Sequence, residues 1–455
     1  MRFPQLALVL YLSCSVMNPP AASENALRES HTNRPNDASL TENRRIESNP
    51  DTVAKSQGAH PRSDPVLQLQ SQHYDRILYA KDDGVVCDGA TDITRKAQAA
   101  IARAVAIGGT DLIFPAGVCL FGAAFPSGRA ERGLGPFNLK VEGAKKLRIR
   151  GAEKEKTTFE QSPSGNNAVI LWVNESEDIE INNISFSGNQ TGLTHGQFST
   201  ALCLYSVKNF RVSDVSSDDK FNGSVIHGNW QFNGVYQRIS QRVSPYSSGF
   251  DVASLQNITF KDWTATGSGI SSQGLHLIFD PPNAHSDYNR TGVSLRGDRS
   301  NAIRIINFSL SKFQSAIVIE SADDVIIRDG IIKKNAPLSS ANTTNFWSGV
   351  TINGAADGVK MRNIRIENTL FVANGNPNAK DKPLNGGILL NSNRGEIQVS
   401  VAGSTFIDNS VAAIASLGRS TFLDIKRSTF RNSAGSSLKG ENISGMIRTP
   451  AGLTD

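Results

Sequence analysis

The chain has 455 residues, of which 38% are apolar and 20% are charged, and it contains 39 glycines. This balance is less charged and richer in turn-forming residues than that of a helical enzyme, and it favours many short strands joined by tight turns. Lys and Arg (47) exceed Asp and Glu (42), but no basic block or basic–aromatic interleaving occurs, so we predict no nucleic-acid partner. The weak positive charge is compatible with an acidic polymer as ligand and does not require one.

The first 23 residues have the pattern of an export signal. Arg2 supplies positive charge, Leu6 to Leu12 form a short apolar core, and Ala21-Ala22-Ser23 offers small residues for cleavage. We therefore predict a signal peptide over residues 1–23 and a secreted or periplasmic protein. No later apolar run is long enough to cross a bilayer, so we predict no membrane span. Residues 24–73 are polar and lack apolar periodicity, which predicts a disordered leader.

Residues 74–139 read as a compact cap with one helix. Apolar residues at helical spacing predict a helix from Ile93 to Ala106, with Thr91 or Asp92 as N-cap and Gly108 as its end. One amphipathic helix before an array of strands is what the open end of a solenoid needs, because the first coil would otherwise expose its core. Two cysteines, at positions 87 and 119, begin and end this unit, and the sequence permits either a disulfide or two buried thiols.

Residues 140–440 contain repeated strand–turn–strand units, and residues 441–455 form a tail. Four units align directly: 201–212, 316–327, 350–361 and 387–398. A Phe followed by Asn closes several of them, and we expect the Phe to stack inward and the Asn to bond the backbone of the turn. Equivalent points fall at Ala168, Thr200, Ser224, Gly249, Gln273, Gly292, Ser315, Gly349, Gly386 and Ala412. Most steps are about one coil of a parallel β-helix long, because a strand rises only ~3.3 Å per residue.

The cap resembles the N-terminal cap of the pectate-lyase-like superfamily, which includes rhamnogalacturonase and epimerase-like β-helix proteins. The resemblance is carried by Asp82-Asp83-Gly84, Asp88-Gly89-Ala90-Thr91-Asp92, the Ala-rich helix, Gly108-Gly109-Thr110 and Phe114-Pro115-Ala116-Gly117. It implies an all-β, right-handed parallel β-helix with an N-terminal α-helical cap, acting on or binding a polysaccharide. It does not select a reaction, since similar proteins include hydrolases, lyases, epimerases and adhesins.

Ionisable residues recur at the spacing of one coil. His227, Asp251 and His276 are separated by 24 and 25 residues, and Asp298 and Glu320 follow at steps of 22. Residues one coil apart stack about 4.8 Å from each other, so we expect a ladder of these side chains on one sheet. Apolar neighbours on both sides of Asp251 and His276 point inward by alternation and leave the polar side chains outward.

A glycoside hydrolase needs two carboxyl groups, one as acid and one as nucleophile or base. We predict Asp251 and Asp280 as this pair, with His276 between them and Glu320 as a reserve acid. The outward face of the strand after Val225 would carry His227, Asn229 and Gln231, with Ile226, Trp230 and Phe232 on the other face. The residues expected to bind substrate are His227, Asn229, Gln231, Arg296, Lys220 and Arg242.

Two other readings stay open. A polysaccharide lyase or C5-epimerase would use a base with nearby cations such as Lys220 and Arg242, and calcium would be needed only in that case. A non-catalytic adhesin would bind polymer without changing it. For the hydrolase we predict no cofactor and no metal, and Asp218-Asp219 reads as a turn or a calcium ligand. Six aromatic residues are candidates for stacking on sugar rings: Trp230, Tyr236, Tyr246, Trp263, Tyr288 and Trp347.

Overall fold

The structure is a computed structural model. It describes residues 73–125, 136–152, 157–162, 168–189, 199–245, 247–268, 272–278, 300–320, 322–335, 348–354, 360–375, 386–392, 395–410, 412–418, 421–431, 438–440, 443–444 and 447–448. These residues all belong to the unit Pro65–Asp455. The predicted signal peptide, the predicted leader apart from His73, and the residues after Arg448 lie outside the described residues, as do Asp280 and Arg296.

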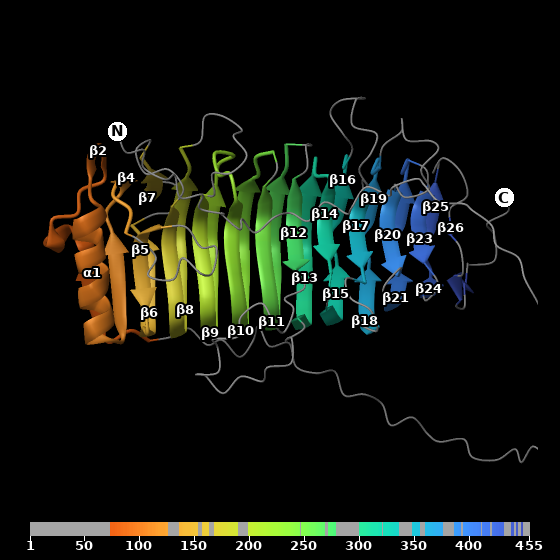
Figure 1. Ribbon diagram of the computed structural model, residues 1–455, viewed down its shortest axis with the longest axis horizontal. Helices are drawn as coiled ribbons and strands as arrows, with labels where there is room; N and C mark the ends of the chain where they lie inside the picture. Colours follow the sequence, from red (N-terminus) through yellow and green to blue (C-terminus); the bar gives the residue numbers. More distant parts are fainter. Residues whose placement is uncertain are drawn as a thin grey trace, which may run out of the picture. The chain divides into compact units, whose positions relative to one another are not determined.

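Parallel strands dominate the described residues, with one α-helix near the start (Figure 1). The cap holds β1 (Arg76–Tyr79), the short 3-10 helix η2 (Ala80–Asp83), β2 (Asp88–Asp92), α1 (Thr94–Ile107), β3 (Thr110–Phe114) and β4 (Gly117–Phe121). The first coils hold β5 (Phe137–Glu142), β6 (Lys145–Gly151), β7 (Thr157–Gln161), β8 (Val169–Ser187) and β9 (Thr200–Ser217). The central coils hold β10 (Ser224–Arg242), β11 (Ser248–Thr266), β12 (Gln273–Ile278), β13 (Ser300–Ser311), β14 (Ser315–Ile319), β15 (Ala322–Arg328) and β16 (Ile331–Lys333).

The later coils continue the same arrangement. They hold β17 (Ser348–Asn353), β18 (Lys360–Glu367), β19 (Leu370–Val372), β20 (Gly386–Ser392), β21 (Glu396–Ala402), β22 (Thr405–Ile407), β23 (Ala412–Gly418), β24 (Thr421–Lys426), β25 (Thr429–Arg431), β26 (Leu438–Gly440), β27 (Ile443–Ser444) and β28 (Ile447–Arg448). Each strand pairs in parallel with the equivalent strand of the next coil, as in β14 with β17 and β17 with β20. The chain therefore winds as a parallel β-helix, as the repeats predicted.

The predicted coil spacing is confirmed to within one residue at most positions. Ser224 pairs with Ser248, Ser248 with Gln273, and Gln273 with Ser315. The direct pairing of Gln273 with Ser315 shows that the expected coil boundary at Gly292 was wrong. Gly292 itself lies outside the described residues.

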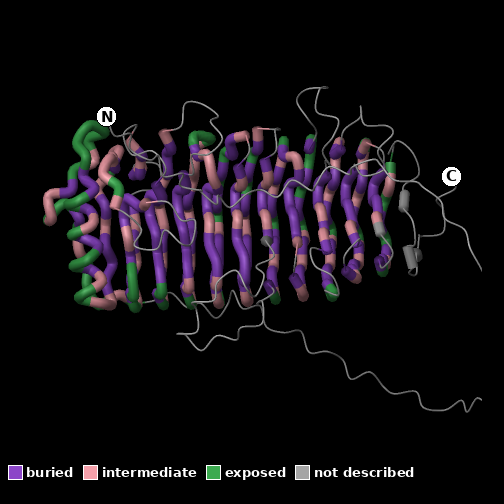
Figure 2. The backbone as a smooth tube through the Cα atoms, viewed as in Figure 1, coloured by how far each residue is buried: buried purple, intermediate pink, exposed green. Residues whose placement is uncertain are grey.

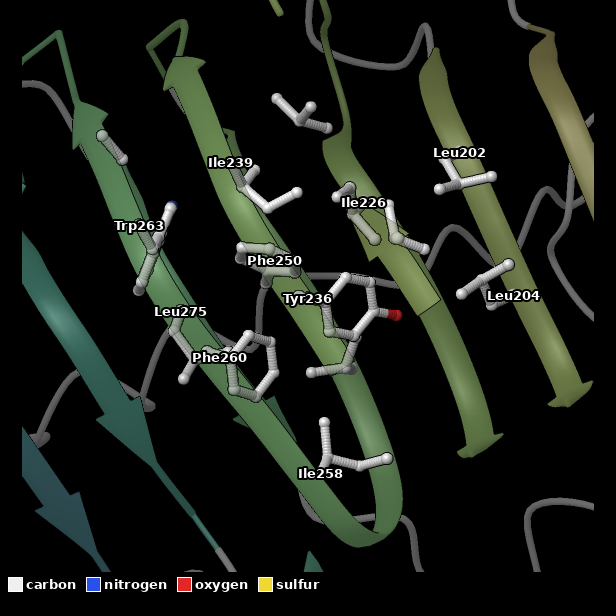
Figure 3. Packing of buried hydrophobic residues seen from close by; sticks show 14 of the residues in the cluster. Leu202, Leu204, Ile226, Tyr236, Ile239, Phe250, Ile258, Phe260, Trp263 and Leu275 are labelled. Carbon is white, nitrogen blue, oxygen red and sulfur yellow. The ribbon is translucent and has the colours of Figure 1, made fainter. Parts of the chain in front are cut away.

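Inward residues stack along the axis and form the core. One inward row runs from Leu202 through Ile226, Phe250 and Leu275 to Ile317, and all five are buried. Figure 3 shows the central part of this core, and Figure 2 shows that buried residues run through all coils. Burial of apolar side chains is the main stabilising contribution, so the continuous row explains why many short strands hold together.

The coils turn at residues with left-handed backbone, and these corners stack as well. Asn209, Asn233 and Asn257 occupy one corner with φ of 52–57°. Asn233 donates to Asn209 Oδ1 at 3.2 Å, and Asn257 donates to Asn233 Oδ1 at 2.9 Å. Asn tolerates this conformation better than most residues, so the Asn-rich composition has a structural cause in the corners.

The Phe and Asn of the repeat behave as predicted. Phe371 and Phe406 stack face to face with centroids 4.7 Å apart. Asn374 and Asn409 are fully buried, and Asn374 Nδ2 donates to Asn409 Oδ1 at 2.9 Å and to Ile332 O at 3.1 Å. A ladder of buried amides therefore satisfies backbone carbonyls at this corner.

The cap closes the first coil with α1, whose buried face includes Ala97, Ile101 and Ala104. The Asp92 carboxylate accepts hydrogen bonds from Thr94 N and Gly122 N, which ties the start of the helix to the end of β4. The helix ends at Gly108, as predicted, with Gly108 N donating to Ala104 O.

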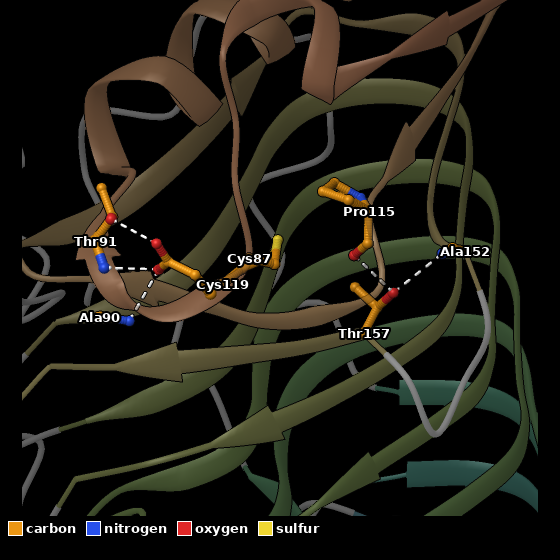
Figure 4. The surroundings of a disulfide bond; sticks show 8 residues. Cys87, Ala90, Thr91, Pro115, Cys119, Ala152 and Thr157 are labelled. Atoms are coloured by element: carbon orange, nitrogen blue, oxygen red, sulfur yellow. Dashed lines mark hydrogen bonds between the residues drawn. A yellow bond between two sulfur atoms is a disulfide. The ribbon is translucent and has the colours of Figure 1, made fainter.

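Cys87 and Cys119 form a disulfide within the cap (Figure 4). This resolves the alternative between a bridge and two buried thiols. Gly117 lies beside the bridge at φ 113°, and a Cβ there would meet Cys87 O at 2.0 Å, so only glycine fits. The bridge thus lies where the backbone of β4 approaches the loop before β2, which carries Cys87.

Candidate functional site

Four ionisable side chains gather on the outer face of the sheet formed by β10, β11, β12 and β14. His227 pairs in register with Asp251, and Asp251 pairs with His276. Their apolar neighbours Phe250 and Leu275 are fully buried, while Asp251 and His276 remain partly exposed. The predicted ladder is therefore confirmed for three residues, because strand alternation sends their side chains away from the core.

The contacts within this cluster form a chain from His227 to Glu320. Nδ1 of His227 lies 3.7 Å from Asp251 Oδ2, and Nδ1 of His276 lies 3.3 Å from Asp251 Oδ1. Nε2 of His276 lies 3.2 Å from Glu320 Oε1. The His276 ring thus stands between two carboxylates, with one nitrogen facing each.

The cluster fixes the charge of its two central members. Burial disfavours the charged form of His276, but its contacts with Asp251 and Glu320 outweigh this effect and raise the pKa of His276 to about 10. Burial likewise disfavours the Asp251 carboxylate, but the adjoining imidazoles of His227 and His276 favour it more strongly and hold the pKa of Asp251 well below its usual value. At neutral pH His276 is therefore a charged imidazolium beside the Asp251 carboxylate.

Glu320 reaches the cluster from a position that its spacing did not predict. The residue paired with His276 is Val318, and Glu320 lies two residues farther along the chain. Its backbone N–H donates to Leu277 O at 3.0 Å, which keeps the end of β14 against β12. Glu320 was predicted as a reserve acid, and it is the second carboxylate that the described residues bring to His276. Asp280 and Asp298 lie outside the described residues.

The prediction that Gln231 faces outward was wrong. Gln231 is fully buried, donates to Leu204 O at 3.3 Å and accepts a hydrogen bond from Tyr236 Oη at 2.8 Å. The cause is Trp230, whose left-handed backbone (φ 53°) forms a corner and reverses the inside–outside alternation. Trp230 is therefore turned out of the core, although the alternation of the preceding strand placed it inward.

The other expected substrate-binding residues that the structure describes have partners outside the chain of contacts from His227 to Glu320. Asn229 is largely buried, and its Oδ1 accepts a hydrogen bond from Trp230 N at 2.8 Å. Lys220 Nζ lies 3.6 Å from Asp218, and Arg242 Nη2 lies 3.0 Å from Asp219. Both cations form ion pairs with carboxylates of the turn after β9, and Arg296 lies outside the described residues.

The prediction that Asp218 lies in a turn is confirmed. Its carboxylate accepts hydrogen bonds from Ser187 Oγ at 2.7 Å, Gly188 N at 3.1 Å and Lys220 N at 3.2 Å. Within the described ranges, no group of three or more His, Cys, Asp or Glu side chains has the arrangement of a metal site. In the same residues no helix is long and apolar enough to cross a membrane.

A separate aromatic cluster covers the same outer face on the cap side of the ionisable residues. Its buried members are Phe137, Val169, Trp172, Cys203 and Tyr205, and Phe125 and Trp230 pack against them. Cys203 pairs in register with Trp172 on one side and with His227 on the other. The aromatic cluster and the ionisable cluster are therefore continuous along one row of coils.

Of the other aromatic candidates, Tyr236 and Trp263 are fully buried in the core. Tyr236 packs on Phe250 and Phe260, and Trp263 Nε1 donates to Gln241 Oε1 at 3.0 Å. Tyr246, Tyr288 and Trp347 lie outside the described residues. Trp230 is thus the one candidate of the six that the structure describes and leaves partly exposed.

No protein-family model matches this chain, and no curated protein sequence matches it. Solved structures do resemble it. The catalytic domain of a GH87 α-1,3-glucanase in complex with tetrasaccharides is 12% identical and has a TM-score of 0.55, with 86% of this chain and 70% of that chain covered. PfbA, a surface adhesin of Streptococcus pneumoniae, is 13% identical with a TM-score of 0.53, and 80% of this chain and 93% of that chain are covered.

A third similar structure is the A-module of the mannuronan C-5 epimerase AlgE6 from Azotobacter vinelandii. It is 14% identical with a TM-score of 0.50, and 82% of this chain and all of that chain (100%) are covered. A glucanase, an adhesin and an epimerase share this fold, so the likeness does not select an activity. At this identity the likenesses show the fold alone: the chain is a right-handed parallel β-helix, the fold that its cap sequence implied.

Proposed function

We propose that this protein is an exported enzyme that acts on a polysaccharide, and that it is a glycoside hydrolase whose reaction takes place at Asp251, His276 and Glu320. The observation that carries the proposal is the placement of two carboxyl groups on opposite sides of one imidazole, on the outer face of the sheet. Two similar structures, a glucanase and an epimerase, are named for activities on polysaccharides, which supports this class of substrate.

The separation of the two carboxyl groups is compatible with an inverting reaction. The contacts of 3.3 and 3.2 Å run to the two nitrogens of the His276 ring. The nearest oxygens are therefore at most about 9 Å apart, a bound that admits the roughly 6.5–9.5 Å of inverting enzymes. Because the His276 ring lies between these oxygens, the attacking water and the sugar would bind on the solvent side of the ring.

The charges of the cluster suggest a role for each group. Asp251 stays ionised and takes a proton from the attacking water as the glycosidic bond breaks. The Nε2 proton of the His276 imidazolium passes through the Glu320 carboxyl group to the leaving oxygen. After the reaction Asp251 holds a proton and His276 is neutral with its remaining proton on Nδ1, and exchange of one proton with solvent at each group restores both charges. His276 also holds the two carboxyl groups at their separation.

A lyase is the second candidate, because the imidazolium of His276 is a cation that could neutralise a uronate carboxylate. The Asp251 carboxylate beside it is a weak base. Two cations expected for that reaction, Lys220 and Arg242, contact Asp218 and Asp219 instead, which favours the hydrolase.

The reaction is tested with purified protein on neutral polymers (laminarin, dextran, α-1,3-glucan) and acidic ones (alginate, polygalacturonate). Reducing ends and ultraviolet absorbance are followed together. A hydrolase produces reducing ends without absorbance, and Glu320→Gln and His276→Gln should lower its rate by about 100-fold or more. Growth of absorbance would identify a lyase, and binding without either product would identify an adhesin. Either result would overturn the hydrolase.

A further inference from the structure

Trp230 occupies a corner that other coils fill with smaller residues. Gly143, Glu175, Ser206 and Ser254 stand at the equivalent corner of the neighbouring coils, and all have left-handed backbone (φ 47–63°). Trp230 has φ 53° at this position. Left-handed backbone crowds the Cβ of every residue except glycine, and a bulky side chain there is unusual. The coil that carries His227 therefore holds an indole at a corner where the neighbouring coils have smaller side chains.

The main core does not hold this residue. Trp230 packs edge to face on Tyr205, with ring centroids 4.9 Å apart, against the aromatic cluster of the outer face. Tyr205 and Trp172 are each only 4% exposed, whereas Trp230 and Phe125 are partly exposed. Solvent therefore reaches the cluster at these two rings, and Trp230 is the one carried by β10, the strand of His227.

The position of Trp230 relates it to the proposed reaction site. Trp230 follows His227 by three residues in β10, and the adjacent coil β11 carries Asp251. Three residues of strand extend about 10 Å, since strands rise ~3.3 Å per residue. A polymer with one sugar ring at Asp251 can therefore place another of its rings on the indole.

We infer that Trp230 is a specificity-determining residue that binds a further pyranose ring of the polymer, near the one that reacts, by contact between the sugar C–H face and the indole. The inference rests on the proposed function, because the ligand is the same polysaccharide. The indole supplies a large flat apolar surface and one N–H donor, the combination that suits a ring with one apolar face and hydroxyls at its edge. The edge-to-face contact with Tyr205 holds the indole in place as a rigid platform for the sugar ring.

The test measures binding rather than turnover, in a chain made inactive by Asp251→Asn. Trp230→Ala, Trp230→Phe and Trp230→Gly are compared by affinity electrophoresis in gels containing laminarin, dextran, α-1,3-glucan, alginate or polygalacturonate, with tryptophan fluorescence as a second readout. On the polymer that the parent chain binds, Trp230→Ala and Trp230→Gly should weaken binding about tenfold or more, and Trp230→Phe should restore most of it.

Trp230→Gly separates a binding role from a structural one, because glycine relieves the left-handed backbone while removing the ring. Its melting temperature should stay within about 2 °C of the parent. Unchanged polymer binding by Trp230→Gly would overturn the sugar-binding role of Trp230 and leave the proposed function standing. A large loss of stability with normal binding by the folded fraction would do the same. Failure of the parent chain to bind any of the five polymers would overturn the proposed function together with that role.

Discussion

His276 is predicted to carry a positive charge far above the pH at which histidine usually loses it, and His276→Gln removes that charge together with the imidazole ring. Glutamine has a similar reach and a neutral amide, so the variant resembles wild type with neutral His276. In wild type the contacts with Asp251 and Glu320 raise the pKa of His276 from 6.5 to about 10. Folding therefore takes up a proton at pH 7–9, and the variant lacks this uptake.

The sign of the effect follows from the raised pKa. The stabilisation is fully present below about pH 6.5 and is lost as pH rises through about 10. A shift of one pKa unit corresponds to about 1.4 kcal/mol, but the side chain is 20% exposed and solvent screens the charges. We expect His276→Gln to lower the free energy of unfolding by about 2–4 kcal/mol at pH 7. For a chain of this size the melting temperature should fall by roughly 3–5 °C.

The assay compares the melting temperatures of wild type and His276→Gln between pH 6 and pH 10.5. All other titrating groups are shared, so their contributions cancel in the difference. The difference should be largest below pH 7 and should shrink toward zero near pH 10. A difference that stays constant over the range, or that grows with pH, would show that His276 is not the charged bridge between the two carboxyl groups.

Three further predictions concern the buried Asn ladder, the disulfide of the cap and the buried side chain of Gln231. Asn374→Ala should destabilise the protein by about 2–4 kcal/mol in urea unfolding, because it leaves amide groups of the buried Asn ladder and Ile332 O without their partners. A change of less than about 0.5 kcal/mol, the usual range of surface substitutions, would contradict this. Reduction of the Cys87–Cys119 bridge, which closes a 32-residue separation, should cost about 3–4 kcal/mol, and Cys87→Ser with Cys119→Ser should make the melting temperature insensitive to reductant. Tyr236→Phe should cost about 1–2 kcal/mol by leaving Gln231 Oε1 unpaired, with the rate on polymer unchanged per folded molecule; a lost rate at normal stability would show that Gln231 acts outside the core.

Much of the fold could be predicted because a parallel β-helix places one coil directly on the next. Spacings of 24 and 25 residues placed His227, Asp251 and His276 in one row, and the structure pairs them in that order. The helix of the cap and the Phe–Asn corners were also predictable, since their signals are local and depend on few residues.

The remaining parts of the site depend on features that spacing does not show. Residues 279–299 interrupt the coil spacing between His276 and Glu320, so counting by coil put Glu320 in the row of His276, whereas Val318 occupies that place. Gln231 was placed outward because alternation was continued through Trp230. The left-handed backbone there reverses it, and tryptophan gives no sequence signal for such a corner. The alignment of Trp230 with Gly143, Glu175, Ser206 and Ser254 is the signal that a coil-by-coil comparison would have used.

The most direct test of the central claim compares two aspartates of the same coil. Asp251→Asn alters the proposed reaction site, while Asp262→Asn changes a corner residue that contacts Gln237 and Asn307, beyond the corners at Ser254 and Asn257. Release of reducing ends is measured for both variants on the polymer that wild type degrades. We predict a loss of about 100-fold or more in Asp251→Asn and a rate within about twofold of wild type in Asp262→Asn. Equal rates in the two variants would contradict the assignment of the site.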